Sequence, residues 1–96
     1  MANYNLSNLA KEDLIRIHHY RIDKFGLKQA DKYFNSFFAR FDNIAKNPFL
    51  FESVDFIKTG YRQCVCGSDS IYFKMNKEGM VEIMTIIGRQ DLNKIP

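Results

Sequence analysis

The sequence of 96 residues has no tryptophan, two prolines, five glycines and two cysteines. Its apolar runs are only a few residues long, far short of the about 20 that a membrane-spanning helix needs. The first residues do not pair a charged start with an apolar run, so they do not predict a signal peptide. The low cysteine count and the missing leader favour a reducing compartment. We therefore expect a cytoplasmic protein without a membrane partner.

Aromatic side chains are plentiful, with nine phenylalanines and five tyrosines. They bury large areas and can build a compact core from few residues. The composition is 46% hydrophobic and 26% charged, typical of an ordinary globular chain. This length predicts one domain, residues 1–96. A formal net charge of +3 permits an acidic partner without requiring one.

Two helices are expected after a short strand at Asn3–Ser7. Ser7 is a plausible N-cap, and Gly26 can close the first helix in the left-handed C′ conformation, with a positive φ. The second helix ends at Asn47–Pro48, because the residue before proline is disfavoured in the α region. The stripe of the first helix is Ala10, Leu14, Ile17, the 21/22 level and Phe25. That of the second is Ala30, Tyr33, Phe34, Phe37, Phe38, Phe41, Ile44 and Ala45.

Three strands are expected after a connector over residues 49–60. They are Tyr61–Cys66, Ser70–Met75 and Met80–Ile87, with a glycine-containing turn at Asn76–Gly79. Strict alternation in the last strand places Val81, Ile83, Thr85 and Ile87 on one face, and Met80, Met84 and Ile86 on the other. The order predicts an α+β fold: an N-terminal strand, an antiparallel helical hairpin, and then a three-stranded antiparallel sheet.

Two pairs of side chains are candidates for chemistry. Cys64 and Cys66 share one face of a strand; they are either metal ligands, which need further partners, or small core residues. His18 and His19 are adjacent on a helix, so at most one faces the sheet; they are acid–base candidates or solvated side chains. Tyr72 and Phe73 lie on opposite faces and can each cover one side of the sheet.

The acids of the helices show no converging pair. Glu12 and Asp13 are expected early in the first helix, and the charges of both helices alternate as on mixed-charge exteriors. There is no glycine-rich phosphate loop, and no cofactor or metal is expected.

The basic residues of the sheet region are Arg62, Lys74 and Arg89. On one face they would hold a phosphate backbone or an acidic protein surface, with arginine binding in bidentate fashion. The alternative is three solvated charges at strand ends.

The ordered motifs of the chain resemble ParE-type toxins of the RelE/ParE superfamily, which belong to bacterial type II toxin–antitoxin pairs. The first half matches through "LSNLAKEDLIRIHHYRIDKFGLKQADKYF". The resemblance continues through "NPFLFESVDFIKTGYRQCVCGSDSIYFKM" and ends at "VEIMTIIGRQDL". It covers residues 4–92 and implies the strand–helix–helix–three-strand fold described above.

The resemblance implies a toxin that a small antitoxin holds inactive in a hetero-oligomer. ParE-type members poison DNA gyrase, whereas RelE-type relatives are ribosome-dependent mRNA endoribonucleases. RelE-type toxins place a Tyr or His near the end of the last strand, and ParE-like sequences commonly carry His where this chain has Gly88. Arg62 and Arg89 match basic positions of the family. Two arginines without a partner for proton transfer suit binding better than RNA cleavage, which favours the gyrase-directed, non-nuclease function. No catalytic residue is therefore assigned.

Two alternatives remain, a RelE-like endoribonuclease and a non-toxic member that only binds its antitoxin. Arg62, Lys74 and Arg89 are the candidates for contact with the target. The apolar excess on both helices and the last strand predicts a groove for an amphipathic antitoxin segment. Its candidate residues are Leu14, Ile17, Phe34, Phe38, Met84 and Ile86.

Overall fold

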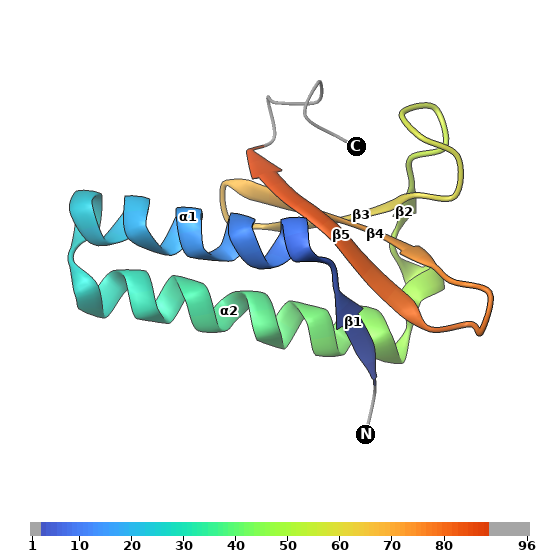
Figure 1. Ribbon diagram of the computed structural model, residues 1–96, viewed down its shortest axis with the longest axis horizontal. Helices are drawn as coiled ribbons and strands as arrows, with labels where there is room; N and C mark the ends of the chain where they lie inside the picture. The colour runs from blue at the N-terminus through green and yellow to red at the C-terminus, as the bar shows by residue number, and fades with distance from the viewer. Residues whose placement is uncertain (1–2, 89–96) are drawn as a thin grey trace.

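The computed structural model describes residues 3–88, which form a five-stranded sheet with two helices on one face (Figure 1). The elements in chain order are β1 (Tyr4–Leu6), α1 (Asn8–Phe25), α2 (Leu27–Lys46), the 3-10 turn η1 (Pro48–Leu50), β2 (Glu52–Ser53), β3 (Arg62–Cys66), β4 (Asp69–Met75) and β5 (Val81–Gly88). Within this part of the chain, neither helix is long and apolar enough to cross a membrane.

The predicted α+β fold is confirmed, with two refinements to the sheet. The strand order is β1-β5-β4-β3-β2. β1 pairs with β5 in parallel, whereas the other pairs are antiparallel, so the sheet is mixed. The short edge strand β2 lies in the segment that the sequence presented only as a connector.

Ser7 joins β1, α1 and β5 through three hydrogen bonds. Its hydroxyl oxygen accepts from the backbone N–H of Ala10 at 3.0 Å, which confirms the N-cap. The same hydroxyl donates to the carbonyl oxygen of Met84 at 2.7 Å, and the Ser7 N–H donates to the carbonyl oxygen of Ile83 at 3.0 Å. The start of the helix is therefore fixed against β5.

Gly26 is the only residue between the two helices. Its N–H donates to the carbonyl oxygen of Ile22 at 2.9 Å, and its own carbonyl oxygen accepts from Ala30 at 3.0 Å. Its φ of 88° is as predicted, but its ψ of 164° is extended rather than helical. Glycine adopts this conformation at no steric cost, so one residue suffices to reverse the chain.

The main core lies between the helices and the sheet. Its fully enclosed aromatic side chains are Phe37, Phe41 and Phe73, and Cys64 and Cys66 pack beside them. Phe25 does not extend this core, since its side chain is 53% exposed. Figure 1 shows why: the connected ends of α1 and α2 extend beyond the sheet.

A bulge in β5 changes which residues face the helices. Tyr72 pairs with Thr85 but Phe73 pairs with Ile83, so one extra residue, Met84, is inserted. Such an insertion breaks the strict alternation of a strand. Ile86 therefore joins Val81 and Ile83 in the main core between the helices and the sheet, whereas Ile87 lies in the core on the opposite face. The predicted division of these residues between the two faces is wrong.

A second, smaller core covers the opposite face of the sheet. It consists of Val54, Tyr61, Tyr72 and Ile87, with Ile57 and Met84 packed against it. Tyr72 and Phe73 thus lie in different cores, as predicted.

Candidate binding surfaces

Arg62 is held by two contacts at the start of β3. Its Nη1 donates to the carbonyl oxygen of Phe51 at 2.7 Å. Its guanidinium carbon lies 5.0 Å from the centre of the Phe49 ring, within the range of a cation–π contact. It borders an open pocket of about 360 Å³ together with Ser53, Asp55 and other residues of the segment before β3. Arg62 is therefore fixed at the border of an open pocket.

Three large apolar side chains are exposed in this region. Phe49 is 70% exposed, Leu50 82% and Phe56 81%. They lie in η1 and in the loop between β2 and β3. Exposed aromatic residues beside an arginine are typical of a protein-binding surface.

The three predicted bases do not form one cluster. Arg62 shares a strand face with the core residue Cys64, whereas Lys74 follows the core residue Phe73 and so lies on the opposite face. Arg62 pairs with Phe73, which pairs with Ile83, five residues before the end of β5. At about 3.3 Å per residue, Arg62 is offset from that end by roughly 16 Å along the strand direction alone. Arg89 lies outside the described residues.

The six residues predicted for the antitoxin groove divide into two groups. Leu14, Ile17 and Ile86 are buried between the helices and the sheet, at most 5% exposed. Ile17 also lines the open pocket at the end of β5. Phe34 and Phe38 are partly exposed on α2, and Met84 is partly exposed on the other side of the sheet. Antitoxin contact by these six residues stays a prediction.

The cysteines and histidines occupy ordinary structural positions. Cys64 and Cys66 are free thiols in the main core. Burial raises the pKa of Cys64, and Cys66 raises it further, against the opposing effect of Arg40. His18 Nε2 lies 2.8 Å from Asp31 Oδ1, which links the two helices, and its ring lies 5.0 Å from that of Phe34. Within residues 3–88, no three metal-ligating side chains form a cluster.

Asp13 was expected on a charged helix exterior, but it is 7% exposed. Its Oδ2 accepts from Thr85 Oγ1 at 2.7 Å and from the N–H of Ile86 at 3.0 Å. Its Oδ1 accepts from Arg16 Nη2 at 3.2 Å. Asp13 also lies beyond the first turn of α1, so helix-dipole stabilisation does not explain its position. The sequence offered one signal: Asp13 lies three residues after Ala10 and four before Ile17, on the buried stripe.

Sequence reasoning also missed the polar groups around the end of β5. Arg16, Tyr20 and Arg21 of α1 and Asp69 of β4 line one pocket together with Gly88. Arg16 and Tyr20 are four residues apart and hence on one helix face, which was the available signal. Only the tertiary structure brings Asp69 to them.

Tyr33 of α2 holds Asp69 in place. Its hydroxyl lies 2.7 Å from Asp69 Oδ2 and 2.9 Å from the carbonyl oxygen of Cys66, and it accepts from the Ser68 N–H at 3.2 Å. Burial raises the pKa of Tyr33, and its hydrogen bond to Asp69 raises it further. The phenol therefore keeps its proton and fixes the hairpin turn to α2.

Comparisons with known proteins agree with this architecture. Residues 4–93 match the family model described as ParE toxin of type II toxin-antitoxin system, parDE. The chain is 31% identical over 93 residues to "Toxin ParE1" of Caulobacter vibrioides, covering 97% of this chain and 94% of the relative. It is 28% identical over 94 residues to "Toxin ParE1" of Mycobacterium tuberculosis, covering 97% and 96%.

A solved structure shows the same fold. A chain of the chromosomal ParDE toxin–antitoxin system from P. aeruginosa superposes with a TM-score of 0.79 at 16% identity, covering 92% of this chain and 96% of that one. The family match spans nearly the whole sequence, so the chain belongs to the ParE toxin family of type II toxin–antitoxin systems.

Proposed function

We propose that this ParE-family toxin arrests growth by acting on DNA gyrase in the cytoplasm, and that a cognate antitoxin neutralises it in a hetero-oligomer. The observation that carries the proposal is the family match over residues 4–93. The surface formed by Arg62 and the exposed side chains of η1 and the β2–β3 loop supports the proposal. This surface offers a fixed charge and exposed aromatic side chains for contact with a large protein.

The test is a gyrase supercoiling and cleavage assay with the purified chain, run with and without the co-expressed antitoxin. We expect cleaved or linear plasmid with the toxin, and its disappearance when antitoxin is added. Unchanged supercoiling and no cleavage at excess toxin would contradict gyrase as the target.

An mRNA endoribonuclease is the second candidate. Tyr20 and Asp69 lie with two arginines beside the end of β5, so the described residues do include polar groups near that strand end. A ribosome-bound mRNA cleavage assay separates this candidate from a gyrase poison.

The third candidate is a non-toxic member that only binds its antitoxin. Gly88 places no side chain at the end of β5, where the resemblance leads us to expect a target contact. This candidate predicts antitoxin binding with no effect on gyrase, mRNA or growth.

A further inference from the structure

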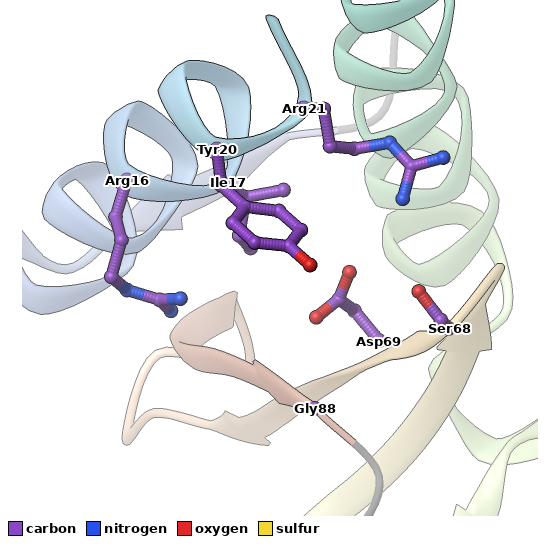
Figure 2. A pocket seen from close by; sticks show the side chains of 7 residues that line it. All are labelled: Arg16, Ile17, Tyr20, Arg21, Ser68, Asp69 and Gly88. Carbon is purple, nitrogen blue, oxygen red and sulfur yellow. The ribbon is translucent and has the colours of Figure 1, made fainter. Parts of the chain in front are cut away.

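The pocket at the end of β5 has a volume of about 300 Å³ and is open to solvent. Figure 2 shows the Tyr20 hydroxyl, the Asp69 carboxylate, the Ser68 hydroxyl and the Arg21 guanidinium converging on one space. These groups come from α1 and from the β3–β4 hairpin, and these two segments lie far apart in the sequence. The pocket is therefore a product of tertiary packing.

Arg21 is held in place without a carboxylate partner. Its guanidinium carbon lies 3.7 Å from the centre of the Tyr33 ring and 4.6 Å from that of Phe25. Among residues 3–88, no acidic side chain forms an ion pair with it, and its buried Nε has no hydrogen-bond partner. A buried donor without an acceptor destabilises the folded state. An anionic ligand would satisfy this arginine, whose orientation is already set.

A second hollow of about 240 Å³ also borders Arg21. It is lined by Gln29, Lys32, Tyr33 and Ser36 as well as by Arg21 itself. Across both hollows, the described lining contains three basic residues, Arg16, Arg21 and Lys32, and one acid, Asp69. The two hollows and the arginine that lines both of them are called the Arg21 site below.

We propose that the Arg21 site binds an acidic peptide segment of the antitoxin, with one carboxylate against the Arg21 guanidinium. This inference rests on the proposed neutralisation by an antitoxin. Arginine pairs with carboxylates through planar, bidentate hydrogen bonds. Asp69 is fixed at the site by Tyr33; it accepts hydrogen bonds from the N–H groups of a peptide, whereas it repels successive phosphates of a nucleic acid. The chemistry of the lining thus favours a peptide.

The first test compares Arg21→Gln with Lys11→Gln by isothermal titration with the full-length antitoxin. Lys11→Gln is the matched control, because it removes the same charge from an exposed position of α1 away from the site. We expect Arg21→Gln to raise the Kd about 10- to 100-fold, since a charge-assisted hydrogen bond is lost. Lys11→Gln should leave the Kd unchanged.

A second variant, Lys32→Gln, tests the proposal even if Arg21→Gln does not fold. Lys32 is exposed, so Lys32→Gln keeps the core intact; it should raise the Kd about two- to fivefold. A folded Arg21→Gln that binds with wild-type affinity overturns the inference. If thermal unfolding shows that Arg21→Gln is not folded, the Lys32→Gln variant decides: an unchanged Kd for Lys32→Gln then overturns the inference.

Two further outcomes distinguish the possible failures. If the wild-type chain does not bind the antitoxin, the proposed neutralisation itself fails. If the wild-type chain binds a fluorescent 12-nucleotide RNA or DNA and Arg21→Gln abolishes that binding while the antitoxin Kd stays unchanged, the site recognises phosphate and the peptide proposal is overturned.

Discussion

At the scale of single residues, Asp13 shows how a charged side chain becomes part of the core. β1 ends at Leu6, which pairs with Ile83, so the edge of β5 beyond that row has no neighbouring strand. The Asp13 carboxylate supplies the acceptor that the Ile86 N–H requires there. It also binds Thr85 and Arg16, and so ties α1 to β5.

We expect Asp13→Ala to lower the free energy of unfolding by about 2–4 kcal/mol, since it leaves buried donors at Thr85 and Ile86 without an acceptor. Urea unfolding followed by circular dichroism measures this change. Glu12→Ala, at the exposed neighbouring position, is the control and should stay within about 0.5 kcal/mol of wild type. Equal stability of the two variants would contradict the structural role of Asp13.

Arg62→Ala should relieve growth arrest and leave the antitoxin Kd unchanged, because its charge is fixed on a surface that we assign to the target. Colony counts after induction measure the first effect and titration calorimetry the second. Lys77→Ala, which removes an exposed charge from the β4–β5 turn, serves as the control and should stay fully toxic. If Arg62→Ala is folded and as toxic as wild type, Arg62 has no part in the mechanism.

At the scale of elements, the β3–β4 hairpin is defined by its two-residue turn, Gly67–Ser68. Gly67 has a φ of 60°, while no non-glycine residue among those described has a positive φ. A glycine with positive φ followed by a residue with negative φ fits a type II′ turn, which matches the twist of the strands that it joins. Tyr33 lies directly against this glycine, so the turn and α2 constrain each other.

Gly67→Ala should destabilise the protein more than Gly79→Ala does. At both positions alanine must adopt a positive φ, which costs about 1–2 kcal/mol. At Gly67 the new Cβ would also lie 2.5 Å from Tyr33 Cε1, whereas nothing lies within 4 Å of it at Gly79. We expect a total loss of about 2–5 kcal/mol at Gly67, measured by thermal and urea unfolding. Similar losses of stability at the two positions would show that the Tyr33 side chain moves away from the new Cβ without an energetic penalty.

At the scale of the whole molecule, the chain builds its two small cores with tyrosines as well as apolar side chains. Burial raises the pKa of Tyr4, Tyr33, Tyr61 and Tyr72 above the ordinary value of 10.0. Nearby acids raise it further for all four: Asp42 for Tyr4, Asp69 for Tyr33, Glu82 for Tyr61 and Glu52 for Tyr72. The folded state therefore binds these phenolic protons more tightly than the unfolded chain does.

It follows that stability should fall at alkaline pH. The contribution of these tyrosines is fully present below about pH 10, the pKa of the unfolded groups, and is lost as the pH rises through the raised values of the folded state. Urea unfolding at pH 8 and pH 11 should give a lower midpoint at pH 11. An unchanged free energy of unfolding between these two pH values would contradict the predicted linkage.

The sequence by itself determined the two helices, four of the five strands and their order; it missed the short edge strand β2. Local signals were enough for this: Ser7 as N-cap, Gly26 and Pro48 as boundaries, and the three–four spacing of phenylalanines in α2. Each depends on a few neighbouring residues, as capping and periodicity do. The ordered motifs also indicated the ParE family, which the comparisons confirmed.

Only the tertiary structure decided which side chains meet. The bulge at Met84 places Ile86 in the main core between the helices and the sheet, because pairing with β4 rather than local alternation sets the register of β5. Asp13 became buried because β1 leaves part of the β5 edge open. Arg62 and Lys74 were candidates for one basic face in the sequence analysis, but they lie on opposite faces of the sheet. Arg21 and Asp69, distant in sequence, line one pocket because α1 and the β3–β4 turn pack together.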